Sequence, residues 1–244
     1  MVENTTKPVV MQIFYAPEIY GKEFTLDEYE SRHCIRVLRM RAGTQVNLID
    51  GKGNLYEGFI SIADQKACRI EIRNVILDFE KRSYNLHIGI SPLKNNDRFE
   101  WFVEKSVEIG IDEITPVVCD NSERKSIKPD RINNIIISAM KQSIKTFRTR
   151  LNHPVTFSEF IRLTDKGIHL IAHCDKDVER LPIRSVYSAG KDAVILIGPE
   201  GDFSPDEIEA AIKYGYISVQ MGKSRLRSET AGIAACHSIY FMNQ

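Results

Sequence analysis

Apolar residues in the first third of the chain recur in short runs with partial alternation, which is typical of β-strands. These runs span residues 9–15, 45–50, 55–62 and 67–77. A turn signal, Asp-Gly-Lys-Gly at residues 50–53, separates the second run from the third. One helical pattern, at residues 26–38, interrupts the strands. Short strands joined by tight turns predict a small β-barrel.

Near Lys81-Arg82-Ser83 the pattern changes to alternating strands and helices. Apolar strand-like runs span residues 86–91, 114–118, 168–174, 193–197 and 217–221. Helical patterns span residues 99–109, 131–145, 205–214 and 229–242. Such alternation predicts an α/β domain whose mostly parallel sheet is covered by helices. We expect the domain boundary within about four residues of Arg82.

Capping residues mark the ends of several predicted helices. Asp97 is the expected N-cap of the helix that follows it, and Gly110 is the expected stop of that helix. Ser204, with Glu207 three residues later, forms a capping-box pattern. Ser228 is the expected cap of the last helix.

Two strand-to-helix loops near the C-terminus carry the most informative pattern. Residues 196–204 read Leu-Ile-Gly-Pro-Glu-Gly-Asp-Phe-Ser, and residues 221–232 read Met-Gly-Lys-Ser-Arg-Leu-Arg-Ser-Glu-Thr-Ala-Gly. Loops at the carboxyl ends of neighbouring parallel strands form a crevice for a small ligand, and glycines let the backbone approach that ligand. A tight turn before a capped helix explains Ser204, but it does not explain Pro-Glu between two glycines. The loops therefore predict a ligand site.

Charged residues in these loops narrow the class of ligand. The first loop is stiff and acidic, which suits a neutral or cationic ligand better than a phosphate. The second loop is not a P-loop, because Ile217 stands where that motif needs glycine. No Gly-x-Gly-x-x-Gly follows a strand, so a nucleotide-dependent enzyme is disfavoured. Arg225, Arg227 and Glu229 precede an apolar helix, which favours the edge of a site over free surface.

Composition limits the compartment and the kind of site. The five cysteines are scattered and odd in number, which argues against a disulfide framework or a zinc site and predicts a reducing cytoplasm. We expect no bound metal, no signal peptide and no membrane span. Residues 1–10 are polar, and the sequence assigns them no role.

Positive charge is uneven along a chain whose formal net charge is zero. Residues 31–41 hold four arginines and no acid, and residues 124–150 hold eight basic residues against one acid. A solvated basic face explains either segment alone. Two such segments on one chain make contact with a phosphate backbone an equally good interpretation.

In order and spacing these motifs resemble those of the RsmE family, the uridine-N3 methyltransferases of 16S ribosomal RNA in the SPOUT class. The resemblance covers nearly the whole chain. It depends most on residues 196–201, 204–208 and 222–230, with further support from residues 33–43, 94–98, 104–110 and 113–116.

The resemblance implies a PUA-like β-barrel that binds RNA at residues 1–82. It also implies a SPOUT methyltransferase domain with a parallel sheet and a C-terminal deep trefoil knot at residues 83–244. The implied methyl donor is S-adenosyl-L-methionine, and the implied substrate is one uridine in the decoding region of the small ribosomal subunit. A homodimer is implied too, with the last helix and the helix at 131–145 as candidate interface elements.

The matched motifs also imply roles for single residues. Ile197, Met221 and Leu226 would sandwich the adenine, and the loop glycines would permit close approach of the backbone. The expected cofactor-binding residues are His173, Ile197, Gly198, Pro199, Glu200, Gly201, Met221, Gly222, Leu226, Thr230 and Ala231. The expected RNA-binding residues are Arg32, Arg36, Arg39, Arg41, Lys94, Arg98, Arg124, Lys125 and Arg148.

Arg227 and Glu229 are the expected catalytic residues, because methylation at N3 of uracil requires loss of a weakly acidic proton. Arg227 would stabilise negative charge on the uracil carbonyls or hold a phosphate. Glu229 would accept the N3 proton or orient Arg227. The orienting role is favoured, because an arginine–carboxylate pair two residues apart would also hold the loop together.

Some positions depart from the family's pattern. Thr44 stands where an acid is common, Asp202 stands where a second glycine is common, and Lys141-Gln142-Ser143 replaces a Glu-Gln-Cys/Ser stretch. Two alternatives stay open. One is a SPOUT methyltransferase for another RNA site, and the other is a non-catalytic RNA-binding protein of ribosome assembly.

Overall fold

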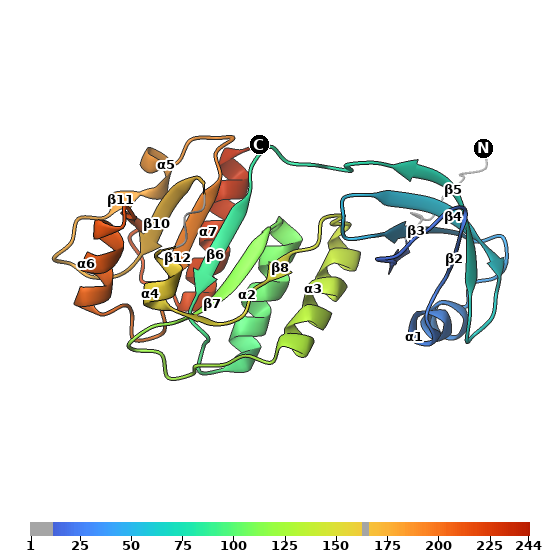
Figure 1. Cartoon of the computed structure of the whole chain (residues 1–244), viewed down its shortest axis with the longest axis horizontal. Helices are drawn as coiled ribbons and strands as arrows, with labels where there is room; N and C mark the ends of the chain where they lie inside the picture. Colours follow the sequence, from blue (N-terminus) through green and yellow to red (C-terminus); the bar gives the residue numbers. More distant parts are fainter. Residues whose placement is uncertain (1–11, 163–165) are drawn as a thin grey trace, which may run out of the picture. The chain divides into compact units, whose positions relative to one another are not determined.

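The structure is a computed structural model that describes residues 12–162 and 166–244. Within these residues the chain forms two compact units (Figure 1). Unit 1 comprises residues 12–81 and 141–147, and unit 2 comprises the rest. Residues 1–10 and the start of the strand predicted at 9–15 lie outside the described residues.

Unit 1 is built on a five-stranded sheet with the strand order β1-β3-β4-β5-β2. The strands are β1 (Ile13–Tyr15), β2 (Glu23–Thr25), β3 (Gln45–Ile49), β4 (Leu55–Ile62) and β5 (Arg69–Ile76). Leu48, Ile60 and Ile70 are buried in its apolar core. Along the described residues β1 and β2 are the two edges and do not pair with each other. The sheet is therefore a half-barrel, which agrees only in part with the small barrel that the turn pattern predicts.

The helical pattern at 26–38 forms two consecutive segments, α1 (Glu28–Arg32) and the π-helical η1 (His33–Val37). Ser31 ties α1 to the sheet, because its hydroxyl accepts the backbone N–H of Cys68 at 2.9 Å. This contact buries one side of the segment and leaves the other in solvent. Arg32 of α1 and Arg36 of η1 are exposed, and so are Arg39 and Arg41, which follow η1.

A later stretch of chain, residues 141–147, completes unit 1. The backbone oxygen of Thr146 accepts the N–H of Gly53 at 3.0 Å, and its hydroxyl donates to the oxygen of Phe79 at 2.9 Å. The Phe147 ring lies so close over Gly53 that no Cβ would fit there. Unit 1 thus includes a segment that is distant from it in sequence.

Along its described residues unit 2 contains an eight-stranded sheet with the order β11-β13-β10-β12-β6-β7-β8, in which β9 pairs with β7. Its strands are β6 (Leu86–Ile90), β7 (Glu113–Val118), β8 (Arg150–Leu151), β9 (Val155–Thr156), β10 (Ile168–Ala172), β11 (Leu181–Pro182), β12 (Ala193–Ile197) and β13 (Ile217–Gln220). Every strand pair is parallel, which confirms the predicted parallel α/β sheet. Because β6 and β12 are buried along their full length, both faces of the sheet must be covered.

Helices provide this cover. They are α2 (Asn96–Ile109), α3 (Pro129–Ser143), α4 (Phe157–Phe160), α5 (Ile183–Val186), α6 (Pro205–Lys213) and α7 (Ser228–Met242). On one face α7 packs against α2, and Gly232 permits the approach, since a Cβ there would lie 2.6 Å from the Phe102 ring. On the other face Phe160 of α4 and Ile208 of α6 pack with Leu196. Among the described residues no helix has the length and apolar content to cross a membrane.

The helix ends follow some of the predicted caps and differ at others. Ser204 forms the predicted capping box of α6, and Gly110 ends α2 with a φ of 118°. The N-cap of α2 is Asn95, not Asp97, because the Asn95 side chain accepts the N–H of Asp97 at 2.8 Å. Ser228 is the first residue of α7 rather than its cap, and the residue before it makes no side-chain capping bond. The first turn of α7 therefore starts without a side-chain cap.

Candidate functional site

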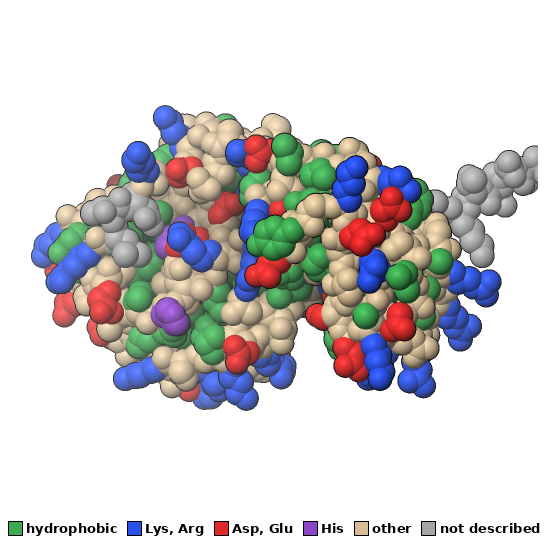
Figure 2. Space-filling model, turned by 45° about the vertical axis from the view of Figure 1, so that its right-hand side comes forward, with side chains coloured by type: hydrophobic (Ala, Val, Ile, Leu, Met, Phe, Trp, Pro, Cys, Tyr) green, Lys and Arg blue, Asp and Glu red, His purple; other side chains and the backbone are tan. Residues whose placement is uncertain are grey.

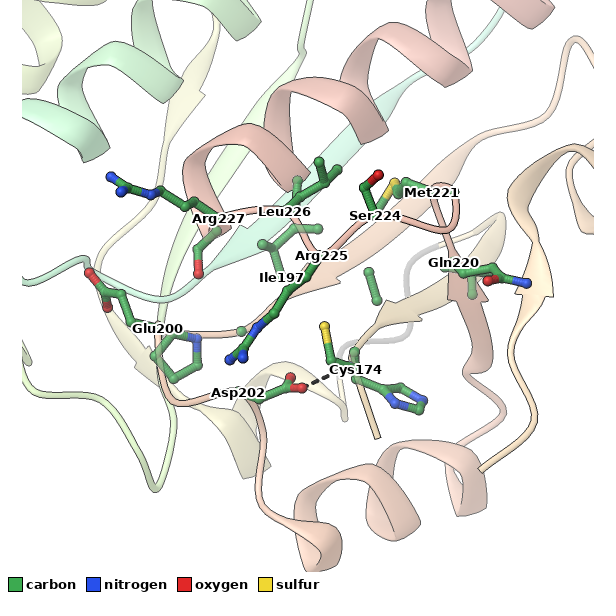
Figure 3. Close-up of a pocket in the computed structure, with 18 of the residues that line it drawn as sticks. Cys174, Ile197, Glu200, Asp202, Gln220, Met221, Ser224, Arg225, Leu226 and Arg227 are labelled. Atoms are coloured by element: carbon green, nitrogen blue, oxygen red, sulfur yellow. Dashed lines mark hydrogen bonds between the residues drawn. The ribbon is translucent and has the colours of Figure 1, made fainter. Parts of the chain in front are cut away.

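A pocket of about 450 Å³ opens in unit 2 at the carboxyl ends of β10, β12 and β13 (Figure 3). These three strands are neighbours in the sheet, in the order β13-β10-β12. The lining residues are Arg98, Ala172, His173, Cys174, Arg180, Ile197, Gly198, Pro199, Glu200, Asp202, Val219, Gln220, Met221, Gly222, Ser224, Arg225, Leu226, Arg227, Ser228 and Ala231. The pocket lies where a parallel sheet generally binds its ligand.

The floor of the pocket is apolar. Ile197 at the end of β12 is 2% exposed, and Val219, one residue before the end of β13, is fully buried. Leu226 and Met221 belong to the same apolar surface as Ile197, and all three lie in the upper part of the view in Figure 3. Such a surface suits a flat aromatic ring, because neither partner then leaves a polar group unpaired.

His173 adds an unpartnered imidazole to this lining. The residue follows β10 and is 5% exposed, and neither ring nitrogen has a hydrogen-bond partner among the described residues. Burial lowers the pKa of the ring below its ordinary value; the Asp202 carboxylate opposes this shift, and the Arg180 guanidinium adds to it. A neutral ring offers one donor and one acceptor, so His173 can hydrogen-bond a polar ligand.

His173 is expected to make the free energy of unfolding fall as the pH drops below about 6.5. Because the pKa of the ring is lower in the folded protein, the unfolded chain binds the proton first, and acidification stabilises the unfolded state. Chemical denaturation of the wild type and His173→Gln between about pH 5 and pH 8 checks this. The wild type should lose stability more steeply. Equal slopes would contradict the expectation.

Asp202 joins the loops that follow β10 and β12. Its carboxylate accepts the backbone N–H of Cys174 at 2.7 Å and that of Phe203 at 2.9 Å (Figure 3 shows the first). Its φ is 65°, in the left-handed region that favours glycine and that aspartate tolerates better than most residues. This backbone conformation explains physically why glycine is common at this position of the motif.

Glu229 pairs with Arg98, not with Arg227. Its Oε1 lies 3.7 Å from Nε of Arg98, and its Oε2 is buried without a partner among the described residues. Arg227 forms no ion pair within the part of the chain that the structure describes. The predicted Arg227–Glu229 pair is wrong, because Arg227 is still extended (ψ 156°) whereas Glu229 is already helical, so the two side chains diverge.

Two expected cofactor residues do not line the pocket. Gly201 packs against Asn121, whose amide donates to the Gly201 oxygen at 3.3 Å, and a Cβ at Gly201 would lie 3.1 Å from Asn121 Cβ. This glycine therefore serves packing between loops. Thr230 lies outside the lining as well, in the first turn of α7. The other expected cofactor residues do line the pocket.

Further lining residues were not among the expected cofactor-binding residues, although one of them, Arg98, was expected to bind RNA. They are Arg98, Ala172, Cys174, Arg180, Asp202, Val219, Gln220, Ser224, Arg225 and Ser228. Ala172 and Val219 could have been found as residues near the carboxyl ends of the strands predicted at 168–174 and 217–221. No sequence pattern indicated Arg180, because its place in the lining depends on contacts with other segments. Its Nη1 donates to the His173 oxygen at 2.8 Å, and its own backbone oxygen accepts from the Gln220 side chain at 3.2 Å.

The expected RNA-binding residues lie on both units, and several have partners. In unit 2, Lys94 forms an ion pair with Glu123 at 2.8 Å, and Arg124 donates to the Lys94 oxygen at 3.3 Å. Arg148 donates to Asn133 at 2.8 Å, Lys125 is exposed, and Arg98 lines the pocket. Figure 2 shows basic and acidic side chains interspersed over much of the visible face.

Comparisons with known proteins give a consistent picture. Residues 80–240 match the family model of the RNA methyltransferase domain, and residues 26–73 match that of the RNA methyltransferase PUA domain. The chain is similar to Ribosomal RNA small subunit methyltransferase E of Buchnera aphidicola, with 25% identity over 240 residues that cover 96% of this chain and 94% of the relative.

Two solved structures share the whole architecture. A probable rRNA-methyltransferase from Porphyromonas gingivalis is 40% identical, with a TM-score of 0.89 and coverage of 96% of this chain and 98% of that chain. Ribosomal RNA small subunit methyltransferase E from Neisseria gonorrhoeae, bound to S-adenosyl methionine, is 26% identical, with a TM-score of 0.85 and coverage of 96% and 98%.

Proposed function

The chain belongs to the RsmE family of small-subunit ribosomal RNA methyltransferases, and from this membership we propose that it methylates N3 of one uridine in the decoding region of 16S rRNA. The methyl donor in this proposal is S-adenosyl-L-methionine. The observation that carries the proposal is the pocket at the carboxyl ends of β10, β12 and β13, which is built from the two motif loops.

The residues of the pocket fit this cofactor. The apolar surface at Ile197 and Leu226 suits an adenine ring. The free ring nitrogens of His173 suit polar atoms of a nucleoside. Gly222, with a φ of 141° and open space around it, exposes backbone groups of the second loop.

S-adenosylmethionine supplies a methyl group on a sulfonium and an uncharged leaving group, so the protein's part is alignment and charge stabilisation. We assign to Arg227 the stabilisation of negative charge on the uracil carbonyls as N3 loses its proton. Glu229 orients Arg98 at the pocket edge, and its unpartnered Oε2 is the candidate acceptor for the N3 proton.

N3 lies on the pairing edge of uracil, so the target must be unpaired or turned out of its stack. We propose that residues 1–82 are the PUA-like RNA-binding domain, with residues 141–147 added to it in unit 1, and that the rest of residues 83–244 is the SPOUT methyltransferase domain. The exposed arginines of α1 and η1 then contact the phosphates around the target.

Arg36→Ala is expected to weaken RNA binding severalfold and to reduce the slope of log K against log salt by about 0.7–0.9. Arg36 is exposed and has no ion pair among the described residues, whereas Arg32 already pairs with Glu28 at 2.7 Å. Arg32→Ala should therefore have the smaller effect. Binding is measured by salt titration, with Lys66→Ala as the control. An unchanged slope for Arg36→Ala would remove it from the interface.

Three finer features complete the proposal. The first is a deep trefoil knot in the C-terminal part of the domain, which the resemblance implies. The second is a homodimer. The exposed Phe241 of α7 supports it, because this large apolar side chain is 68% exposed in a single copy of the chain and a dimer interface would cover it. The third is a cytoplasmic location, which the five free cysteines support. Light scattering in solution tests the dimer.

The proposal is tested by methyl incorporation from labelled S-adenosylmethionine into undermodified small subunits and into protein-free 16S rRNA. Reverse-transcription arrest maps the modified nucleotide. Arrest at one decoding-region uridine is the expected result. Cofactor binding without incorporation would favour another RNA site, and absence of cofactor binding would favour the assembly-protein alternative.

A further inference from the structure

Two side chains of opposite charge face each other across the pocket. Asp202 comes from the loop after β12 and Arg225 from the loop after β13, and both line the cavity. Figure 3 shows Arg225 extending from its loop across the cavity toward the loop of Asp202. Within the described residues neither forms an ion pair, so the space between the two charges is left to a ligand.

The Asp202 carboxylate is held in place before any ligand arrives. Each of its oxygens accepts one backbone N–H, from Cys174 and Phe203. The backbone oxygen of Asp202 also accepts from the Asn121 amide at 3.1 Å. A carboxylate offers about four acceptor positions, so each oxygen can still accept one further hydrogen bond. Asp202 is therefore a fixed acceptor with free capacity on the pocket wall.

The other charged residues of the lining are occupied or lie elsewhere. Glu200 is exposed, and its carboxylate points away from the cavity (Figure 3) and accepts the backbone N–H of Lys94 at 3.1 Å. Arg98 pairs with Glu229, and Arg180 donates to the His173 oxygen. Arg227 begins α7, where we assign it to the RNA base. Arg225 and Asp202 remain as the guanidinium and the carboxylate that are free for the cofactor itself.

We propose that Asp202 and Arg225 bracket the amino-acid end of the cofactor. Asp202 accepts hydrogen bonds from the α-ammonium, and Arg225 donates to the α-carboxylate. An α-amino acid carries both charges on one carbon, and a fixed carboxylate opposite a free guanidinium complements it. The apolar floor is left to the adenine. This inference depends on the proposed cofactor, and it assigns a role to an aspartate that the common glycine could not fill.

The test uses four ligands, of which two carry the complete amino-acid end, one lacks the carboxylate and one lacks the whole amino acid. They are S-adenosylmethionine, S-adenosylhomocysteine, decarboxylated S-adenosylmethionine and 5′-methylthioadenosine, which lacks the amino acid. Dissociation constants are measured by calorimetry for the wild type, Asp202→Asn and Arg225→Ala. Asp206→Asn on α6 and Lys223→Ala in the second loop are matched controls, because neither residue lines the pocket.

Asp202→Asn is expected to weaken the first three ligands roughly tenfold or more and to leave 5′-methylthioadenosine within about twofold. Arg225→Ala should weaken only the two ligands that keep the carboxylate. Asp202→Gly is the second variant, because glycine suits a φ of 65° and removes the carboxylate without backbone strain. It should show the same ligand pattern as Asp202→Asn.

An equal loss of affinity for 5′-methylthioadenosine would overturn the inference. Asp202 would then contact the sugar or hold the loop in its conformation. Unchanged constants for all four ligands would overturn it as well. Failure of the wild type to bind any of the four is a different result, because it would overturn the proposed function itself.

Discussion

Arg227→Ala is expected to lower kcat for methyl transfer by roughly 10²- to 10³-fold, the usual cost of removing one donor from a developing anion. Affinity for S-adenosylmethionine should change less than about threefold, because the Arg227 side chain is exposed and extends away from the apolar floor (Figure 3). Single-turnover kinetics on undermodified small subunits and calorimetry with the cofactor measure the two effects. Lys223→Ala is the control, since it removes a charge from the same loop outside the pocket lining.

Equal losses in turnover and in cofactor affinity would contradict this role and make Arg227 a part of the cofactor site. Glu229→Gln then separates the two roles of Glu229. Loss of turnover at unchanged cofactor affinity agrees with a proton acceptor. Full turnover at unchanged affinity would exclude that role and leave Glu229 as the residue that positions Arg98.

Phe160→Ala is expected to lower the free energy of unfolding by about 3–5 kcal/mol, the usual cost of truncating a fully buried phenylalanine. Phe160 is 0% exposed, and its ring packs over Gly89 of β6 and beside the His87 ring, with centroids 5.2 Å apart. Denaturant unfolding measures the loss. Leu77→Ala, at a position that is 71% exposed, is the control and should stay within about 0.5 kcal/mol of the wild type.

Gly89 supplies a second measurement on the same contact. A Cβ at Gly89 would lie 2.5 Å from the Phe160 ring, so Gly89→Ala should destabilise the wild type. In the Phe160→Ala background the same substitution should cost much less, because the ring is gone. Additive effects of the two substitutions would show that ring and strand are not in direct contact.

The sheet of unit 2 could be predicted because its central strands are buried on both faces and read as continuous apolar runs. The prediction of β12 at 193–197 agrees with the structure, as does the α6 capping box at Ser204. β2 was missed because Glu23–Thr25 is an exposed edge strand of three residues, too short for alternation to appear. The sequence predicts a small barrel and the structure forms a half-barrel, because turn signals indicate strands but do not determine whether the first and last of them pair.

The site was predictable where the backbone itself forms it. Loops at the ends of neighbouring parallel strands converge whatever side chains they carry, so the pocket followed from β12 and β13. Side-chain partners did not follow, because they depend on distant segments. Glu229 meets Arg98 of α2, and Gly201 packs against Asn121 after β7. No spacing near residues 201 or 229 carries that information.

Because residues 141–147 belong to unit 1, recombination between related genes cannot exchange this unit as one continuous stretch of sequence. A gene fragment that stops at Lys81 encodes a half-barrel in which Gly53 has lost the Phe147 ring and the Thr146 oxygen that cover it. The complementary fragment contains Phe147 but lacks Gly53, against which the Phe147 ring packs. The two units therefore have to be inherited together, and a swap between relatives has to exchange two separate stretches of coding sequence rather than one.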